Sequence, residues 1–238
     1  MSDTPCICHE APDAKALAHD LSDFVAAHLR AGLDQRHEAL LVVSGGSTPL
    51  PFFEALSQVD LDWSRVTVTL ADERWVAPDH ADSNERLVRA HLLQGPASRA
   101  RFVPLKSGQA TVLNGLDEVE ARLEALPWPA DVVVLGMGAD AHTASLFPHA
   151  PELGVALDED RRQRCLAVAA PPLPNVPVDR ISLSKAALLD ARHLVVHVTG
   201  QAKRALLQQA KLDGPQESMP IRLAWQQSHV PCHVFISN

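Results

Sequence analysis

Short apolar runs alternate along the chain with longer stretches in which apolar residues return every three or four positions. The runs ALLVV, DVVVLG and LVVHV are apolar at nearly every position, which is typical of parallel strands buried on both faces. The strands predicted from such runs are Ala39–Ser44, Val66–Ala71, Arg101–Pro104, Asp131–Gly136, Arg164–Ala169, Arg180–Ser184, His193–Thr199 and Cys232–Ser237.

The segments between these runs show helical periodicity. In Asp13–Ala31 the apolar residues, from Leu17 to Leu29, lie close to a spacing of 3.6 residues. The same pattern predicts helices over Asn84–Leu93, Leu116–Leu126 and Gln201–Gln209. Strand, turn and helix repeated in this way predict an α/β fold, a three-layer α/β/α sandwich around a mainly parallel, Rossmann-like sheet.

The alternation continues on both sides of the proline-rich stretch Pro171–Pro177. We therefore interpret this stretch as a stiff loop and not as a linker between domains. At 238 residues the chain is long enough to form one large α/β domain. We expect a single domain over residues 1–238.

Charge and hydropathy narrow the choice of partner and compartment. The net charge of −8 argues against nucleic acid or an anionic membrane as the main partner. The first twenty residues have no basic start followed by an apolar run, and no apolar stretch approaches the roughly 18 residues of a membrane helix. We expect a cytoplasmic protein, a monomer or a weak homo-oligomer, that binds a small molecule.

Four cysteines are present, Cys6, Cys8, Cys165 and Cys232, without a CxxC pair. A cytosolic chain would keep them reduced. The segment from Cys6 to His9 fits either a metal clip or an alternating edge strand. The edge strand is the simpler interpretation, and we expect no bound metal.

The loop after ALLVV has the composition of a phosphate cradle. It comprises Ser44, Gly45, Gly46, Ser47 and Thr48, followed by proline. The two glycines let the backbone approach a ligand closely, and Thr48 is predicted to cap a helix beginning at the proline. Free N–H groups at such a helix start favour an anion. A plain strand-to-helix turn is the alternative, since the loop matches neither a Walker A motif nor GxGxxG.

A second glycine-rich loop follows DVVVLG and contains a candidate general base. The loop runs GMGADAHTASLFP, and His142 stands two residues after Asp140. An imidazole with a pKa near about 6.5 exchanges a proton readily at neutral pH.

Charged residues follow or begin three further strands. Asp72 and Arg74 lie in DERW, Arg180 begins RISLS, and Lys203 lies in the first turn of a predicted helix. Ligands of open α/β sheets bind outside the carboxyl ends of the strands, and a cation at a helix start is favourable when an anion lies beside it. Salt bridges and solvated surface positions are the alternatives. The pair Ser83-Asn84 is explained by helix capping.

Taken in order, SGGSTP, DERW followed by SN, GMGADAHTASLFP, RISLS and GQAK resemble the 6-phosphogluconolactonase family and, more widely, the glucosamine-6-phosphate deaminases. The resemblance covers about Leu40 to Leu207. The related deaminases carry DGHIAFNEP where this chain has DAHTASLFP, and typically a tyrosine in place of Arg74. The TASLFP segment therefore favours the lactonases.

The resemblance implies hydrolysis of 6-phospho-D-glucono-1,5-lactone to 6-phospho-D-gluconate in the oxidative pentose phosphate pathway, without a cofactor. It implies that His142 acts as base, that Asp140 orients it, and that Arg74 stabilises the oxyanion. The residues that would bind the substrate and its phosphate are Ser44, Gly45, Gly46, Ser47, Thr48, Asp72, Arg180 and Lys203. An amino-sugar-phosphate isomerase or deaminase and a non-catalytic sugar-phosphate sensor are the alternatives.

The family usually has glycine where this chain has Ala141. If the position needs a positive φ, alanine costs roughly 1 kcal/mol. The loop that carries His142 would then be strained or shifted.

Overall fold

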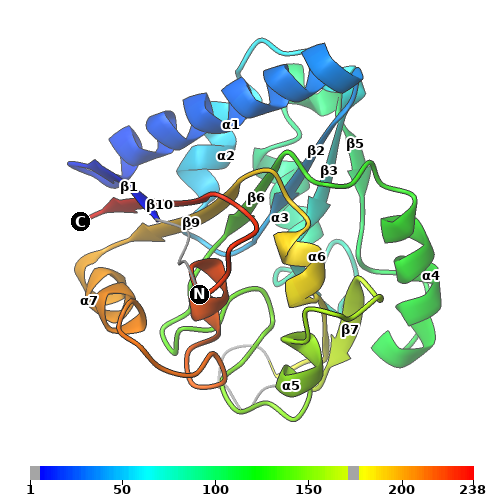
Figure 1. The fold of residues 1–238 in the computed structure, drawn as a ribbon. Helices are drawn as coiled ribbons and strands as arrows, with labels where there is room; N and C mark the ends of the chain where they lie inside the picture. Colours follow the sequence, from blue (N-terminus) through cyan, green and yellow to red (C-terminus); the bar gives the residue numbers. More distant parts are fainter. Residues whose placement is uncertain (1–5, 171–176) are drawn as a thin grey trace.

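The computed structural model describes residues 6–170 and 177–238, so the predicted loop Pro171–Pro177 lies almost wholly outside the described residues. A parallel sheet forms the centre of the molecule (Figure 1). Its strands, in spatial order, are β1 (Ile7–Ala11), β10 (Cys232–Ser237), β9 (Leu194–Thr199), β6 (Val132–Leu135), β2 (Ala39–Val43), β3 (Val66–Leu70) and β5 (Arg101–Val103).

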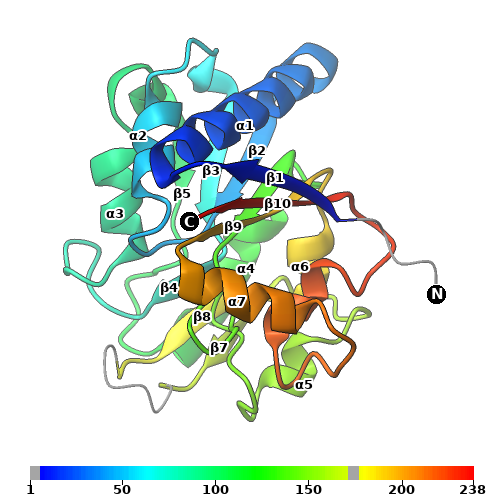
Figure 2. The ribbon, with the colours of Figure 1, turned by 90° about the vertical axis from the view of Figure 1, so that its left-hand side faces the viewer.

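Helices cover both faces of this sheet. Figure 2 shows α1 on one side of β1, β10 and β9, and α7 on the other. Every residue of β2, β3 and β6 is buried, as expected for the unbroken apolar runs of β2 and β6. The helices are α1 (Ala14–Arg36), α2 (Leu50–Ser57), α3 (Asn84–His91), α4 (Val112–Glu124), α5 (Leu153–Ala156), α6 (Lys185–Leu189) and α7 (Gln201–Ala210). The predicted three-layer α/β fold is confirmed.

Two of the predicted strands lie outside the parallel sheet. β7 (Cys165–Val168) and β8 (Arg180–Leu183) form a small antiparallel sheet with β4 (Asp72–Arg74). The periodicity did not predict β4, because a strand of three residues is too short to show a pattern. β1 lies at the edge of the main sheet, which confirms the edge-strand interpretation of the segment that begins at Cys6.

Caps decide where the helices begin and end. The side chain of Asp13 accepts a hydrogen bond from the backbone N–H of Ala16 at 2.8 Å and starts α1. This helix continues to Arg36, beyond the predicted end, and His37 closes it in the left-handed conformation with φ of 65°. Thr111 caps α4 and places its start upstream of the predicted Leu116.

The strand order reverses between β2 and β6. From β2 the chain proceeds outward to β3 and β5, whereas β6, β9 and β10 extend the sheet in the opposite direction. Because all these strands are parallel, the loops after β2 and β6 leave the same edge and diverge around one point. Such a switch point is where open α/β sheets bind ligands.

Four histidines gather between α1 and the strands β1, β9 and β10. His28 and His193 have ring centroids 3.6 Å apart, and His9 Nε2 lies 3.2 Å from His233 Nδ1. Burial lowers the pKa of His28, although the charge of Asp131 opposes this. Burial and the neighbouring histidines lower the pKa of His193 and of His233 to about 4. The folded chain therefore favours the neutral forms of His28, His193 and His233.

We expect the free energy of unfolding to fall as the pH falls from about 6.5 towards 4. In the unfolded chain His193 and His233 regain a pKa near about 6.5, so in this window the unfolded state binds more protons. Above this window both states are neutral at these residues and the contribution of the cluster is fully present. Urea unfolding across this range measures the slope.

His193→Gln should reduce the slope of the unfolding free energy against pH by the contribution of about one bound proton. The exposed His19→Gln serves as the control. Equal slopes for the His193 variant and the unaltered chain would contradict the assignment.

Candidate active site

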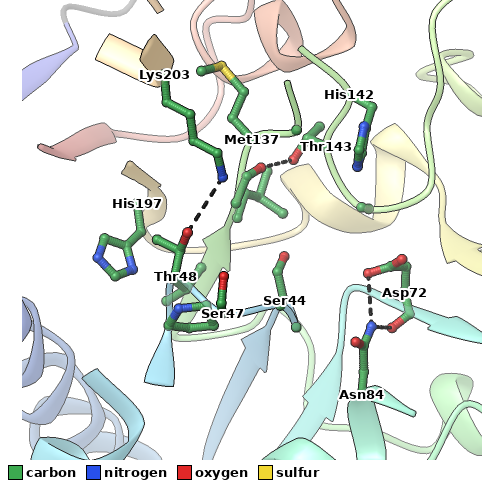
Figure 3. Close-up of a pocket in the computed structure, with 18 of the residues that line it drawn as sticks. Ser44, Ser47, Thr48, Asp72, Asn84, Met137, His142, Thr143, His197 and Lys203 are labelled. Atoms are coloured by element: carbon green, nitrogen blue, oxygen red, sulfur yellow. Dashed lines mark hydrogen bonds between the residues drawn. The ribbon is translucent and has the colours of Figure 1, made fainter. Parts of the chain in front are cut away.

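A cavity of about 220 Å³ opens at the switch point (Figure 3). The loops after β2 and β6 line it, together with residues of β4, α3, β6, β8, β9 and α7. Of the residues predicted for the site, the cavity is lined by Ser44, Gly45, Gly46, Ser47, Thr48, Asp72, Arg74, His142, Arg180 and Lys203. Asp140 does not line it but contacts His142.

The loop after β2 presents free backbone donors. The N–H of Ser44 donates to the carbonyl of Val134 at 3.0 Å and ties the loop to β6. Among the described residues, the N–H groups from Gly45 to Thr48 have no intramolecular acceptor. Gly46 has φ of 96°, a conformation that favours glycine. The geometry is that of an anion cradle.

Thr48 does not cap the helix that follows, so this prediction is wrong. α2 begins at Leu50 with Pro49 as N-cap and without a side-chain cap. The hydroxyl of Thr48 is turned to the cavity instead, where Lys203 Nζ lies 3.5 Å from it. Burial lowers the pKa of Lys203. A half-buried ammonium next to free N–H groups is a good partner for an anion.

His142 and Asp140 form a coupled pair at the other end of the cavity. His142 Nδ1 lies 2.5 Å from Asp140 Oδ1, whose oxygen also accepts the backbone N–H of His142 at 3.1 Å. Burial acts to raise the pKa of Asp140, but the hydrogen bonds and charge of His142 hold it below its usual value. Because Nδ1 faces the carboxylate, Nε2 is the nitrogen available to a ligand.

Close packing against glycine fixes the imidazole. A Cβ on Gly138 would lie 2.1 Å from both Cε1 and Nδ1 of His142. On another side the ring of Phe147 has its centroid 4.6 Å from that of the imidazole. Glycine at position 138 is therefore required by the position of His142.

Ala141 adopts the left-handed conformation with φ of 65°. Its N–H donates to the carbonyl of Gly138 at 3.1 Å, and its carbonyl accepts from the N–H of Ile221 at 3.0 Å. The turn therefore keeps its hydrogen bonds, at a backbone cost of about 1 kcal/mol. The expected strain is present, and His142 still lines the cavity.

The small antiparallel sheet places two arginines on neighbouring strands. Arg74 of β4 lies directly across from Arg180 of β8. Arg74 Nη1 donates to the carbonyl of Asp82 at 2.6 Å. Burial lowers the pKa of Arg180, the charge of Arg74 adds to this, and the charge of Asp72 opposes it. Both guanidinium groups remain at the cavity wall.

Asn84 is a cavity residue that the sequence interpretation missed. Ser83 does cap α3, accepting from the N–H of Arg86 at 3.2 Å. Asn84 is buried, and its Nδ2 donates to the backbone carbonyl of Asp72 at 2.9 Å. Ser145 Oγ also holds Asp72, donating to Oδ2 at 2.6 Å. One residue is enough to cap a helix, so helix capping does not explain Asn84 once Ser83 is the cap. This unexplained polar residue was the signal in the sequence for a second role.

Glu73 holds the backbone that carries Asp72 and Asn84 in place. Its buried carboxylate accepts the backbone N–H groups of Arg74, Asn84 and Glu85 at 2.7, 2.8 and 2.7 Å. Burial outweighs these hydrogen bonds and raises the pKa of Glu73 to about 7. The carboxylate joins β4 to the start of α3 and so fixes Asp72 relative to Asn84.

His197 was also missed, because it lies within the apolar run of β9. It is buried at the cavity wall, and within the described residues neither ring nitrogen has a hydrogen-bond partner. Burial, reinforced by the charge of Lys203, lowers its pKa to about 4. His197 is therefore neutral at physiological pH, and Lys203 carries the positive charge at this end.

Within residues 6–170 and 177–238, no cluster of histidine, cysteine, aspartate and glutamate has the arrangement of a metal site. The helices described there are too short or too polar to cross a membrane.

Comparison with known proteins identifies the family of this chain. Residues 12–232 match the protein family described as glucosamine-6-phosphate isomerases/6-phosphogluconolactonase. A 6-phosphogluconolactonase of Pseudomonas aeruginosa is 47% identical, and the match covers 86% of this chain and 85% of that protein. One of Rhizobium meliloti is 41% identical, with 95% and 97% covered.

The crystal structure of a 6-phosphogluconolactonase from Shewanella baltica has a TM-score of 0.93 to this chain, with 43% identity and 98% of each chain covered. The chain belongs to the glucosamine-6-phosphate isomerase/6-phosphogluconolactonase family.

Proposed function

We propose that this chain hydrolyses 6-phospho-D-glucono-1,5-lactone to 6-phospho-D-gluconate in the oxidative pentose phosphate pathway. The observation that carries the proposal is the placement of an anion cradle and a histidine–carboxylate pair in one cavity. The two relatives named above are 6-phosphogluconolactonases, and the matches to this chain cover 85% and 97% of their length. We extend the proposal to one sugar-phosphate-binding domain of 238 residues that acts in the cytoplasm as a monomer or weak homo-oligomer.

The phosphate is anchored at the end of the cavity where Thr48 and Lys203 meet (Figure 3). It accepts hydrogen bonds from the free N–H groups of Gly45 to Thr48, and Lys203 and Arg180 supply opposite charge. Ser44 and Asp72 also line the cavity and contact the sugar hydroxyls. Anchoring holds the lactone carbonyl beside His142, which supplies the proximity part of catalysis.

His142 Nε2 removes a proton from a water molecule as the water attacks C1 of the lactone. Asp140 holds the ring through Nδ1 and stabilises the imidazolium that forms. The proton then passes to the ring oxygen as the ester bond breaks. Arg74, at the cavity wall, stabilises the oxyanion of the tetrahedral intermediate.

The direct test generates the lactone in situ and follows its decay with and without the chain, subtracting the spontaneous hydrolysis. Enzyme-dependent decay supports a lactonase. Ammonia release from glucosamine 6-phosphate would instead indicate a deaminase, and ligand binding without turnover would indicate a sensor.

His142→Ala should lower kcat by roughly 10²-fold or more, because the general base is lost. Binding of 6-phosphogluconate, followed by calorimetry, should persist because the anion cradle is intact. The exposed His19→Ala is the matched control. An unchanged kcat would remove His142 from the mechanism.

Lys203→Ala should raise KM by about 10-fold or more with a smaller change in kcat, because a hydrogen bond to a charged group is worth about 1.5–3 kcal/mol. Steady-state kinetics at fixed ionic strength measure both constants. The exposed Lys15→Ala should leave them unchanged. A loss confined to kcat would contradict an anchoring role.

Gly138→Ala should displace the imidazole of His142, since the added Cβ would lie 2.1 Å from two ring atoms. We expect kcat to fall and the imidazole NMR resonances of His142 to move, as the contact with Asp140 is lost. Gly108→Ala adds a Cβ in open space and is the control. Imidazole resonances of His142 identical to those of the unaltered chain would refute the packing constraint.

A further inference from the structure

Two cysteines meet where the first and last strands of the chain begin. The register of β1 and β10 places Ile7 across from His233, so Cys6 precedes β1 directly across from Cys232. Their Sγ atoms lie 3.0 Å apart. Figure 2 shows β1 running along β10 at this edge of the molecule. Neighbouring strands are separated by about 4.7–4.9 Å, which is within the Cα range of disulfide bonds.

The two thiols differ in accessibility. Cys6 is partly accessible, whereas Cys232 is buried. Hydrogen bonding with the Cys232 thiol lowers the pKa of Cys6, burial opposes this, and the charge of Lys211 adds to the lowering. The same hydrogen bond and burial raise the pKa of Cys232. Cys6 is therefore the thiolate that attacks first, and Cys232 is the second thiol.

The remaining cysteines have other surroundings. Cys8 is exposed. Cys165 is buried, with its Sγ 3.2 Å from Glu120 Oε2, and burial raises its pKa. Neither side chain has a second sulfur within hydrogen-bonding distance among the described residues.

We propose that Cys6 and Cys232 are a reversible disulfide-forming pair whose oxidant is a low-molecular-weight disulfide such as glutathione disulfide. The Cys6 thiolate attacks one sulfur of the oxidant, forms a mixed disulfide and releases one glutathione thiolate. The Cys232 thiol then loses its proton to solvent and attacks Cys6 Sγ. The bond between Cys6 and Cys232 forms as the second glutathione thiolate leaves, so two protein thiols are oxidised and one disulfide is reduced.

The bond would join the two ends of the fold without touching the cavity. Cys6 and Cys232 stand at the start of their parallel strands, whereas the cavity lies at the carboxyl ends of β2, β6 and β9. Closing a loop between residues 226 positions apart constrains the unfolded chain strongly. Oxidation should therefore raise thermal stability and leave catalysis unchanged.

The test incubates the full chain with glutathione disulfide, quenches with acid and alkylates the unfolded protein. We expect two of the four cysteines to escape alkylation, and peptide mapping to find Cys6 linked to Cys232. The thermal midpoint should rise by roughly 5–10 °C and return on reduction with dithiothreitol.

Cys6→Ser should abolish the cross-link and the rise in the midpoint, whereas the control Cys8→Ser should retain both. The reduced variants should melt close to the reduced unaltered chain, which shows that they fold. Four alkylatable thiols after oxidation, a stable glutathione adduct on Cys6 beside a free Cys232, or a link between Cys6 and Cys8 would each overturn the proposal.

Discussion

The pairing of β2 with β6 is the constraint on which the rest of the site depends. These strands are parallel and in register from Leu41 across from Val132 to Val43 across from Val134. The bond from Ser44 N–H to the carbonyl of Val134 extends the pairing by one step. Both loops therefore leave the sheet at one point and diverge, so a hollow forms where neither loop can close over the other. The anion cradle and the loop of His142 both line it.

Within that hollow, glycines leave room for the side chains of other residues to pack against the backbone. A Cβ on Gly45 would lie 1.9 Å from Asn84 Oδ1, and one on Gly138 would lie 2.1 Å from the ring of His142. Each glycine thus lets a side chain from another position pack directly on the backbone. Ala141 shows the complementary case, because its left-handed conformation is retained by hydrogen bonds on both sides despite the Cβ.

The sequence was informative wherever a local pattern decides the structure. Continuous apolar runs predict buried parallel strands, and β2, β6 and β9 follow them closely. Local composition also identified the loops after β2 and β6 as candidate functional loops. The antiparallel pairing that brings Arg74 to Arg180 joins positions far apart in the chain, and no local pattern encodes it. His197 was hidden by the apolar run around it, and the Thr48 cap failed because its hydroxyl is turned to the cavity.

The electrostatics explain how a chain of net charge −8 can bind a phosphorylated substrate. Burial lowers the pKa of Lys203 and of Arg180, so it disfavours their charged forms. An anion beside them reverses that effect, and its attraction is strong because little water screens it. His197 stays neutral, so the positive charge at this end comes from Lys203. In the proposed complex the binding energy therefore comes from a few groups that line the cavity, and the acidic surface, separated by solvent and screened by salt, contributes little.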